Sequence, residues 1–524
     1  MQREFIIHDG LSINELQTIL QNNLHISPAP PQQLQRTCYD SFDWRLFASN
    51  AVLEDKINGK QHELVWRSLN DGNQRVQISL ASAPRFARDI PPGQLRDYLE
   101  PVLEMRELMP RVSISSRVHT LRVLDKIEKT VARIIIEENR VRRRNGGKVL
   151  LQDNRVIILP VKGYQKVFKR IEKTLQDMGL KPATEDLILK ALAVTGHKPG
   201  DYSSKLDLHL DPGMRSDQAA RIILLRLLDI IEDNEAGTRR GTDTEFLHDF
   251  RVAVRRTRSA LSQIKSVLPT PVLNRYKGEF AWLGQMTTPS RDLDVYLLTF
   301  DDYKQSLPAS AQTDIEPLRD FLIRHQAIEH RALLKALDSA RYRRLVENWR
   351  KFLVQPVNER STLKNAQRPV YELACKRIWK VYKGILREGR AIEANTEAVA
   401  LHELRKTGKK LRYLMEFFQS LFPAAEIKAL IRVLKQLQDN LGDFQDYEVQ
   451  VHTLKAFSRQ MVDENTAPPE TLLAMGMLIE GLEKRQFRAR EEFAARFENF
   501  SAEENRGHFR ELFTGCNAIQ DTPQ

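Results

Sequence analysis

The second half of the chain contains one basic motif twice. HDFRVAVRRTR at 248–258 and HELRKTGKKLR at 402–412 both fit H-x-x-R-x-x-x-[RK]-[RK]-x-R, with an offset of 402 − 248 = 154 residues. A chance charge run would not carry a proline, acids and apolar positions in fixed register, so the offset predicts a duplicated unit. The positions related in this way outside the motif are Pro269 and Pro423, Leu283 and Leu437, Asp292 and Asp446, Val295 and Val449, and Arg331 and Arg485.

Beyond about residue 212 the sequence reads as helical throughout. RSDQAARIILLRLLDIIEDNE has apolar residues three and four apart, with Ser216 available as an N-cap, and this texture continues to about Phe513. The breaks LPTPVL, QSLPAS, FLVQP, LFPAAE and TAPPE leave room for about eight helices. Together with the repeat, this predicts an all-α domain at 215–515 made of two pseudo-twofold-related four-helix bundles, at about 215–350 and 369–513.

Residues 1–200 contain both helical and strand-like sequence patterns. Helical spacing occurs in LSINELQTILQNNL and GYQKVFKRIEKTLQDMGL, and strand candidates are REFII, HELVWRSL, QRVQISLA, VARIIIEENRVR and KVLLQDNRVIILPV. RRNGGK, between the last two strands, is a hairpin signal. We therefore expect an α+β domain at 1–200, with a linker at 201–214 around the Pro-Gly pair of SKLDLHLDPGM.

The charge balance favours an anionic partner. Lys and Arg number 81 against 69 Asp and Glu, a net charge of +12, which suits nucleic acid, anionic membrane or phosphate polymers. The start, MQREFIIHDG, lacks the apolar core of a signal peptide, and no apolar run approaches the roughly 20 residues that span a bilayer. We expect a cytoplasmic protein that does not enter the membrane. P-loop, GxGxxG, HExxH, GxSxG and CxxC patterns are absent from the sequence.

Helical geometry places the motif's charges on one stripe. Positions 248, 251, 255 and 258 step by three, four and three residues, and so do 402, 405, 409 and 412. The residues expected on the core-facing side are Phe250, Val254, Leu261 and Ile264 in the first copy and Leu404, Leu411 and Phe418 in the second. Like charges at this spacing are mildly unfavourable. Two stripes lining one groove would therefore call for an anion, whereas a single stripe is more often a solvated face.

Acidic residues follow each motif by one helix. Asp292 and Asp294 in the first copy correspond to Asp446 and Glu448 in the second. Such pairs are read either as catalytic or metal-binding acids or as partners of the basic stripe. We predict the second, because buried cations need carboxylate partners to orient them.

The doubled motif, with RDLDV at 291–295 and QDYEV at 445–449, resembles the CHAD domain, the conserved histidine α-helical domain. The resemblance implies that a basic central surface binds inorganic polyphosphate. Lysine at 409 and 410 keeps the charge of the first copy's arginines but loses their bidentate geometry. The implied binding residues are His248, Arg251, Arg255, Arg256, Arg258, His402, Arg405, Lys406, Lys409, Lys410 and Arg412, with Arg226 and Lys380 as wall residues.

The first 200 residues resemble the CYTH family, whose fold is an antiparallel β-barrel or tunnel for triphosphate. CYDSFDWRLFASNAVL at 38–53 suits a turn leading into a strand. The family's Glu-x-Glu-x-Lys signature falls on Glu4, Ile6 and His8, and one glutamate does not readily hold a catalytic metal. Only Arg67 and Arg75 stand out as basic wall candidates. The expectation is a degenerate CYTH-like domain without catalytic or metal-binding residues.

Three functions stay open at this point. The favoured one is polyphosphate binding without catalysis or cofactors; the alternatives are a metal-dependent inorganic triphosphatase in the N-terminal domain and nucleic-acid binding. Nucleic acid ranks lower, because single strands need stacking platforms and Tyr413 is the one aromatic residue near the motif charges. Polyphosphate binding in the cytoplasm would be compatible with association with polyphosphate granules.

Overall fold

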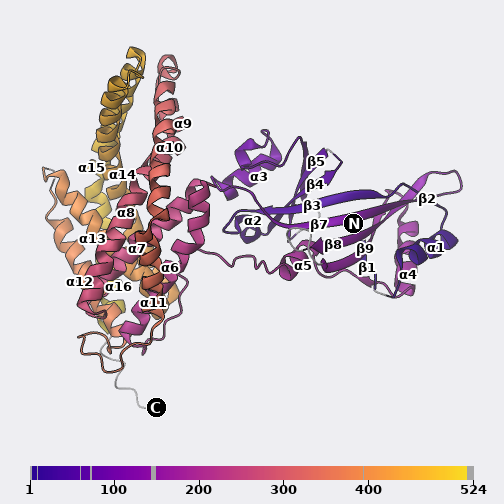
Figure 1. The fold of residues 1–524 in the computed structure, drawn as a ribbon, viewed down its shortest axis with the longest axis horizontal. Helices are drawn as coiled ribbons and strands as arrows, with labels where there is room; N and C mark the ends of the chain where they lie inside the picture. The colour runs from indigo at the N-terminus through magenta and orange to yellow at the C-terminus, as the bar shows by residue number, and fades with distance from the viewer. Residues whose placement is uncertain are drawn as a thin grey trace. The chain divides into compact units, whose positions relative to one another are not determined.

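The computed structural model describes residues 3–8, 10–59, 61–70, 74–142, 149–393 and 395–515. The chain divides into two compact units, residues 1–203 and 204–524, and each is described by itself. The first unit contains the strands and the second only helices and short turns (Figure 1). No described helix has the length and apolar character needed to cross a membrane.

The N-terminal unit is an antiparallel sheet in the order β10-β1-β9-β8-β7-β3-β4-β5-β6, with β2 paired to β7. Each strand candidate from the sequence is a strand, and β4 starts where the segment 38–53 was expected to lead into a strand, but β2, β3, the long β7 and β10 were not predicted. RRNGGK lies outside the described residues, although the strands beside it pair with Arg142 opposite Val149. The strands are β1 Arg3–Ile6, β2 Ile26–Pro28, β3 Gln32–Asp40, β4 Ala51–Asn58, β5 Gln61–Ser68, β6 Arg75–Leu80, β7 Met109–Leu124, β8 Thr130–Arg142, β9 Val149–Pro160 and β10 Lys181–Pro182.

The expected closure into a barrel is not found in the described strands. The sheet ends at β10 on one side and β6 on the other, and these edges do not pair within the part of the chain described. Strand β10 is only two residues long, and Pro182 has no backbone N–H to donate to another strand. The sheet is therefore open.

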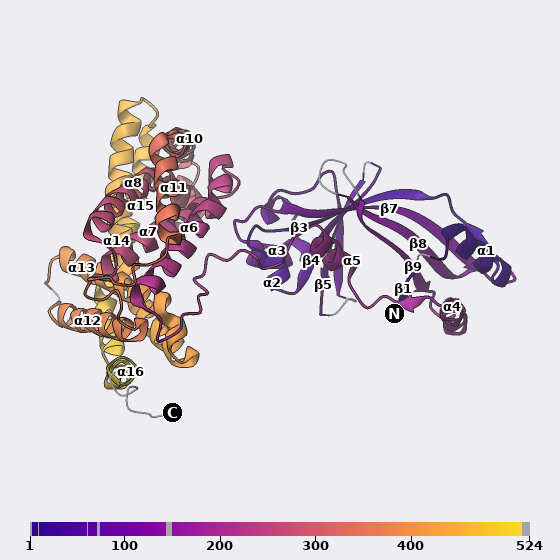
Figure 2. The ribbon, with the colours of Figure 1, turned by 60° about the horizontal axis from the view of Figure 1, so that its bottom comes forward.

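One face of the sheet is apolar and covered by helices α1 and α4 (Figure 2). Leu16 and Leu20 of α1 pack with Ile171 and Leu175 of α4 on alternate residues of β7, β8 and β9. The Ser12 hydroxyl accepts from Glu15 N in a capping box that starts α1. The helices are α1 Ile13–Asn23, α2 Arg45–Ala48, α3 Gln94–Leu103, α4 Gln165–Asp177 and α5 Leu187–Val194.

The helical unit contains α6 to α16 in its described part. All five sequence breaks fall between helices or at helix ends. Ser216, expected as an N-cap, is instead the first helical residue, and its hydroxyl donates to Arg368 O at 2.7 Å. The helices are α6 Ser216–Arg240, α7 Thr244–Gln263, α8 Thr270–Leu298, α9 Phe300–Ser306, α10 Glu316–Asp338, α11 Ala340–Val354, α12 Val370–Arg390, α13 Ala398–Phe418, α14 Ala424–Asp463, α15 Pro469–Phe500 and α16 Glu503–Thr514.

The apolar side of the two motif helices is buried as predicted. Phe250 and Val254 of α7 and Leu404 and Leu411 of α13 belong to one hydrophobic cluster that also includes residues of α6, α8, α11, α12, α14, α15 and α16. A second cluster joins α8, α9 and α10 to α14 and α15. The basic sides of α7 and α13 are thereby fixed on a rigid base.

Residues 204–210, within the expected linker, pack on the helical unit. Leu206 and Leu210 are buried in its main cluster. Gln419 donates to Leu206 O at 2.9 Å, and Leu210 N donates to the Ser420 hydroxyl at 3.2 Å. This segment is thus part of the helical unit.

Replacing Gly237 by alanine should destabilise the helical unit. An added Cβ would lie 2.2 Å from Cδ1 of Phe246 on α7, and such overpacking costs about 1–3 kcal/mol of the free energy of unfolding. Denaturation followed by circular dichroism measures it. The control is Gly278→Ala in α8, where nothing lies within 4 Å and where we expect a gain of up to about 1 kcal/mol. Equal effects of the two changes would contradict close packing of α6 on α7.

Candidate anion-binding site

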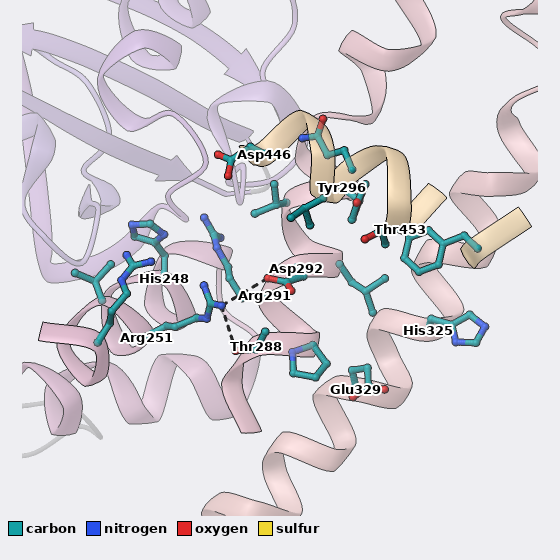
Figure 3. Close-up of a pocket in the computed structure, with 18 of the residues that line it drawn as sticks. His248, Arg251, Thr288, Arg291, Asp292, Tyr296, His325, Glu329, Asp446 and Thr453 are labelled. Atoms are coloured by element: carbon teal, nitrogen blue, oxygen red, sulfur yellow. Dashed lines mark hydrogen bonds and ion pairs between the residues drawn. The ribbon is translucent and has the colours of Figure 1, made fainter. Parts of the chain in front are cut away.

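A cavity of about 820 Å³ lies between helices α7, α8, α10, α13 and α14 (Figure 3). Five of its lining residues are Arg or Lys and three are Asp or Glu, so the cations are in excess before the histidines are considered. The polar and charged lining residues are His248, Arg251, Arg255, Thr288, Arg291, Asp292, Tyr296, His325, Glu329, Arg405, Lys409, Asp446, Gln450, Thr453 and Gln460.

Both copies of the motif contribute to this cavity. His248, Arg251 and Arg255 come from α7, and Arg405 and Lys409 come from α13. These five are the predicted binding residues that the fold brings together in one cavity. Since α7 and α13 are far apart in sequence, only the tertiary packing makes their stripes neighbours.

The acids that follow the motif orient two of its arginines. Arg251 donates to the Thr288 hydroxyl at 3.1 Å and lies 3.7 Å from Asp292 (Figure 3). Burial lowers the pKa of Arg251 and raises the pKa of Asp292, although each opposes the other's shift by its charge. Their mutual attraction only partly offsets the loss of hydration.

The second copy has an equivalent arginine–aspartate pair, with a glutamine and a histidine in addition. Arg405 donates to Asp446 at 2.9 Å and also to Gln445. Gln445 in turn lies 3.0 Å from Nε2 of His402, so this histidine is held beside the cavity rather than in its lining. Asp294 departs from the prediction, because it accepts from Gln326 at 2.9 Å and not from an arginine of the motif.

In the described part of the chain, Arg255 and Lys409 form no ion pair with an acid, although the charge of Asp446 partly offsets the repulsion on Lys409. Nε of Arg255 is buried and has no hydrogen-bond partner in the part of the chain described. The pKa of Lys409 falls to about 8, first because burial disfavours its charge and then because Arg405 and Arg255 repel it. A bound anion would relieve both effects.

Several predicted residues lie outside the cavity lining. Arg256 donates to Ser204 O at 2.9 Å and to Glu416 at 3.0 Å, and Arg412 donates to the other oxygen of Glu416 at 2.9 Å. One glutamate thus bridges the two motif helices and neutralises both arginines in part. The remaining residues outside the lining are Lys406, which pairs with Glu403 at 2.8 Å, and the exposed or half-buried Arg258, Lys410, Arg226 and Lys380.

Other lining residues were missed from the sequence. Arg291 is buried, donates to Thr244 O at 3.1 Å and lines the cavity (Figure 3). Its position next to Asp292 in RDLDV could have indicated from the sequence that it belongs to the site. His325 and Glu329 come from α10, outside both motifs, and no pattern in the sequence points to them.

The polar face of the N-terminal sheet also carries charges, contrary to the sparse set expected there. Arg155 donates to Glu4 at 2.8 Å and to Asp153 at 2.5 Å, and Arg36 donates to Glu137. Arg67 pairs with Glu54 at 3.0 Å and with Asp186 at 2.7 Å. Sequence patterns did not predict this charged face, because its strand residues come from six different strands, and the spacing of residues within one strand does not show which strands pair.

These acids do not fit a catalytic metal. Glu4, at the first position of the family signature, is engaged by Arg155. In the residues that the structure describes, no three His, Cys, Asp or Glu side chains gather as metal ligands would. Metal-assisted hydrolysis needs carboxylates that leave coordination positions open to phosphate, and ion-paired acids do not provide them.

Comparison with known proteins adds the family. Residues 222–455 match the model of the CHAD domain family. The chain is similar to the CHAD domain from the plant Ricinus communis, with 25% identity, a TM-score of 0.47 and coverage of 56% of this chain and 94% of that one. It is also similar to PptA from Streptomyces chartreusis, with 16% identity, a TM-score of 0.43 and coverage of 54% and 99%.

The N-terminal part is similar to a putative adenylate cyclase from Bacillus halodurans. The identity is 11%, the TM-score is 0.26, and the match covers 36% of this chain and 95% of that one. No curated protein matches the chain. On the match to residues 222–455, the helical unit of this chain contains a CHAD domain.

Proposed function

We propose that the helical unit binds inorganic polyphosphate in the cavity between α7 and α13, without catalysis. The observation that carries this proposal is the juxtaposition of Arg255 and Lys409, half-buried cations from the two motifs that repel each other and form no ion pair with an acid in the described part of the chain. Phosphate oxygens are strong acceptors for guanidinium and ammonium groups. A chain of phosphates supplies one such anion after another.

The lining favours phosphate over nucleic acid. Tyr413, the aromatic residue nearest the motif charges in sequence, is 5% exposed and packs in the core, so it offers no platform for a base. Among the lining residues only Tyr296 and Phe457 are aromatic. Binding of single strands depends on bases stacked on successive aromatic rings, whereas a phosphate chain needs only charge and hydrogen-bond donors.

We infer that α6–α11 and α12–α16 are two copies of one fold. Helices α6, α7 and α8 start at residues 216, 244 and 270, and α12, α13 and α14 start at 370, 398 and 424, so each start is displaced by 154. Ser216 N donates to Arg368 O at 2.9 Å and Val370 N donates to Met214 O at 2.8 Å. The same offset exchanges these two hydrogen bonds, as a pseudo-twofold axis would.

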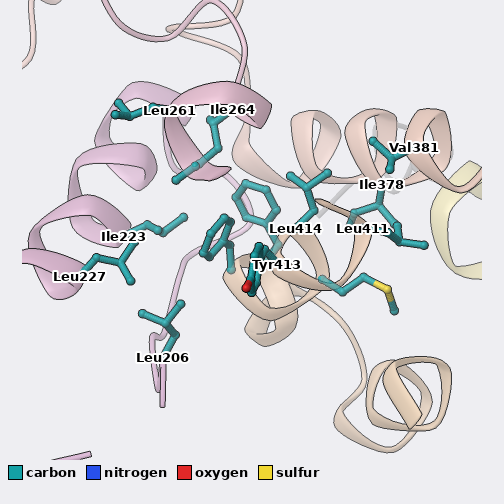
Figure 4. Packing of buried hydrophobic residues seen from close by; sticks show 14 of the residues in the cluster. Leu206, Ile223, Leu227, Leu261, Ile264, Ile378, Val381, Leu411, Tyr413 and Leu414 are labelled. Atoms are coloured by element: carbon teal, nitrogen blue, oxygen red, sulfur yellow. The ribbon is translucent and has the colours of Figure 1, made fainter. Parts of the chain in front are cut away.

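A pseudo-twofold axis would also explain why equivalent cations of the two motifs lie close together at the cavity. Arg255 and Lys409 differ by 154 and interact electrostatically, so the axis passes near both. The core has the same arrangement, with apolar side chains of α6 and α7, such as Ile223 and Leu261, opposite those of α12 and α13, such as Ile378 and Leu411 (Figure 4). The boundaries of 215–350 and 369–513 remain our proposal for the copies, with 1–200 as a degenerate CYTH-like domain.

Removing the unpaired cation should weaken polyphosphate binding. We expect Arg255→Ala in the full chain to bind long-chain polyphosphate about 10–100-fold less tightly, because charge-assisted hydrogen bonds contribute about 1.5–3 kcal/mol each. The double change Arg251→Ala/Arg405→Ala should in addition flatten the dependence of affinity on salt, as fewer phosphates are neutralised. Fluorescence anisotropy over a salt series measures both.

The control for these variants is Lys406→Ala, an exposed lysine outside the cavity that already pairs with Glu403. Its affinity should stay within about twofold of the unmodified chain, because exposed ion pairs contribute little. Equal losses in Arg255→Ala and Lys406→Ala would contradict a cavity site. If DNA displaces polyphosphate but polyphosphate does not displace DNA, the ligand is nucleic acid instead.

Affinity should also fall as pH rises through about 8, the pKa of Lys409. Bound phosphate favours the protonated amine and raises this pKa, so binding is strongest where the free protein still holds the proton. Between pH 7 and 9 we expect a loss of about fivefold to tenfold, since one pH unit above a pKa removes about nine-tenths of the charge. Lys409→Arg should lose this component of the pH profile, and an unchanged profile in that variant would contradict the assignment.

A further inference from the structure

The exposed face of α12 carries a second basic stripe, which the cavity does not include. Lys376, Lys380, Lys383 and Arg387 follow one another at intervals of four, three and four residues, so they share one side of the helix. All four side chains are exposed. The apolar side of α12, including Ile378 and Ile385, is buried in the main core, which fixes the stripe toward solvent.

Cations of neighbouring elements extend the stripe into a surface. Helix α13 packs beside α12, and a Cβ on Gly384 would lie 3.9 Å from Cγ2 of Thr407. Lys410 of α13 and Lys265, just after α7, are both exposed. The pKa of Lys265 is lowered by burial and then by Lys277, Arg377, Lys380 and Lys410, and no carboxylate is among the causes. We call Lys376, Lys380, Lys383, Arg387, Lys410 and Lys265 the α12 surface.

Of the carboxylates close in sequence, Glu388 lies beside Arg387 with its Oε2 buried and without a hydrogen-bond partner in the described residues, Glu403 also interacts electrostatically with Lys410, and two are held by cations outside the α12 surface. Glu372 pairs with Arg368 at 3.6 Å, and Glu403 pairs with Lys406 at 2.8 Å. Within the described ranges, no residue of the α12 surface forms an ion pair with an acid. Like charges at this spacing destabilise a helix slightly, so the repulsion along the stripe does not itself stabilise α12.

Duplication does not explain the stripe either. With the offset of 154, its four positions correspond to Ile222, Arg226, Asp229 and Asp233 on α6. Asp229 pairs with Arg350 at 2.6 Å. The first copy thus has a mixed, partly acidic face where the second copy has an entirely cationic one.

In the first copy, the side chain at the position equivalent to Lys410 is not available to solvent in the same way, because other residues bind it. Arg256 occupies that position, and it is held by Ser204 O and Glu416. Leu206, in the same segment, is buried (Figure 4). One side of the pseudo-twofold is therefore covered by residues 204–210, while the equivalent side of the second copy is exposed at Lys410.

The α12 surface adjoins the cavity. Lys409 lines the cavity and Lys410 belongs to the surface, and consecutive residues of a helix are about 100° apart around an axis with a diameter of about 10–12 Å. A flexible anionic chain that leaves the cavity beside Lys409 meets Lys410 next. The charges then continue along α12.

We propose that the α12 surface is a second binding segment for the same polyphosphate chain, so that a long chain occupies the cavity and the α12 surface together. The proposal rests on the proposed function of the cavity. It predicts discrimination by chain length, because only a long chain gains from both segments, whereas tripolyphosphate fills the cavity alone. Linking two modest sites in this way raises affinity without new contacts at either.

The test uses the full chain with Lys376→Gln, Lys380→Gln and Lys383→Gln combined. We expect affinity for long-chain polyphosphate to fall about tenfold or more and its salt slope to decrease by about two, since each neutralised phosphate contributes about 0.7–0.9. Affinity for tripolyphosphate should not change. The matched control removes three exposed charges from α11, with Arg343→Gln, Arg344→Gln and Lys351→Gln, and should leave both affinities as they were.

The outcomes separate the two proposals. If the unmodified chain binds neither ligand, the proposed function of the cavity is wrong. If it binds both, and the α12 variant binds long chains as tightly as the unmodified chain, the second segment is wrong and the cavity stands. An α12 variant that loses affinity for single-stranded DNA but not for polyphosphate would likewise overturn the proposal, because the surface would then serve nucleic acid.

Discussion

Contact between α7 and α13 forces like charges together, and the rest of the helical unit is organised around that contact. The two helices bury Phe250, Leu404 and Leu411 almost completely on their apolar sides, and each such side chain contributes about 1.5–3 kcal/mol when removed from water. The repulsion between Arg255 and Lys409 opposes this burial. Because the core holds the cations in place before any ligand arrives, an anion does not have to order them, and little conformational entropy is lost on binding.

Ion pairs with acidic residues determine which of the motif cations can still interact with an anion. Glu416 accepts hydrogen bonds from Arg256 and Arg412, one from each motif, and so connects the two motif helices. Arg251 and Arg405 each pair with a single acid, Asp292 and Asp446 respectively. A guanidinium has five donors, so an arginine fixed by one carboxylate still has N–H groups for phosphate. The charge left over is concentrated at Arg255 and Lys409.

The repeat explains how much of this was predictable from the sequence. The stripe that carries Arg251 and Arg255 on α7 and the one that carries Arg405 and Lys409 on α13 each follow from helical periodicity alone, and so does the apolar side that buries Phe250. Periodicity does not reveal which partner helix covers a given charge, and for that reason Arg256 and Arg412 were assigned to the ligand although Glu416 engages them. His325 was missed because α10 reaches the cavity through tertiary packing, and the ion pairs of the sheet were missed because they join strands distant in sequence.

The two units of the chain differ in how they treat buried charge, and this difference separates a structural network from a binding site. In the sheet, Arg155 is bound by Glu4 and Asp153, and Arg67 by Glu54 and Asp186. Displacing such a partner leaves a buried carboxylate without its cation, which costs about 3–5 kcal/mol. In the cavity, Nε of Arg255 has no partner to displace. On the proposed function, an anion therefore gains the full interaction there, whereas on the sheet it would first have to break an ion pair.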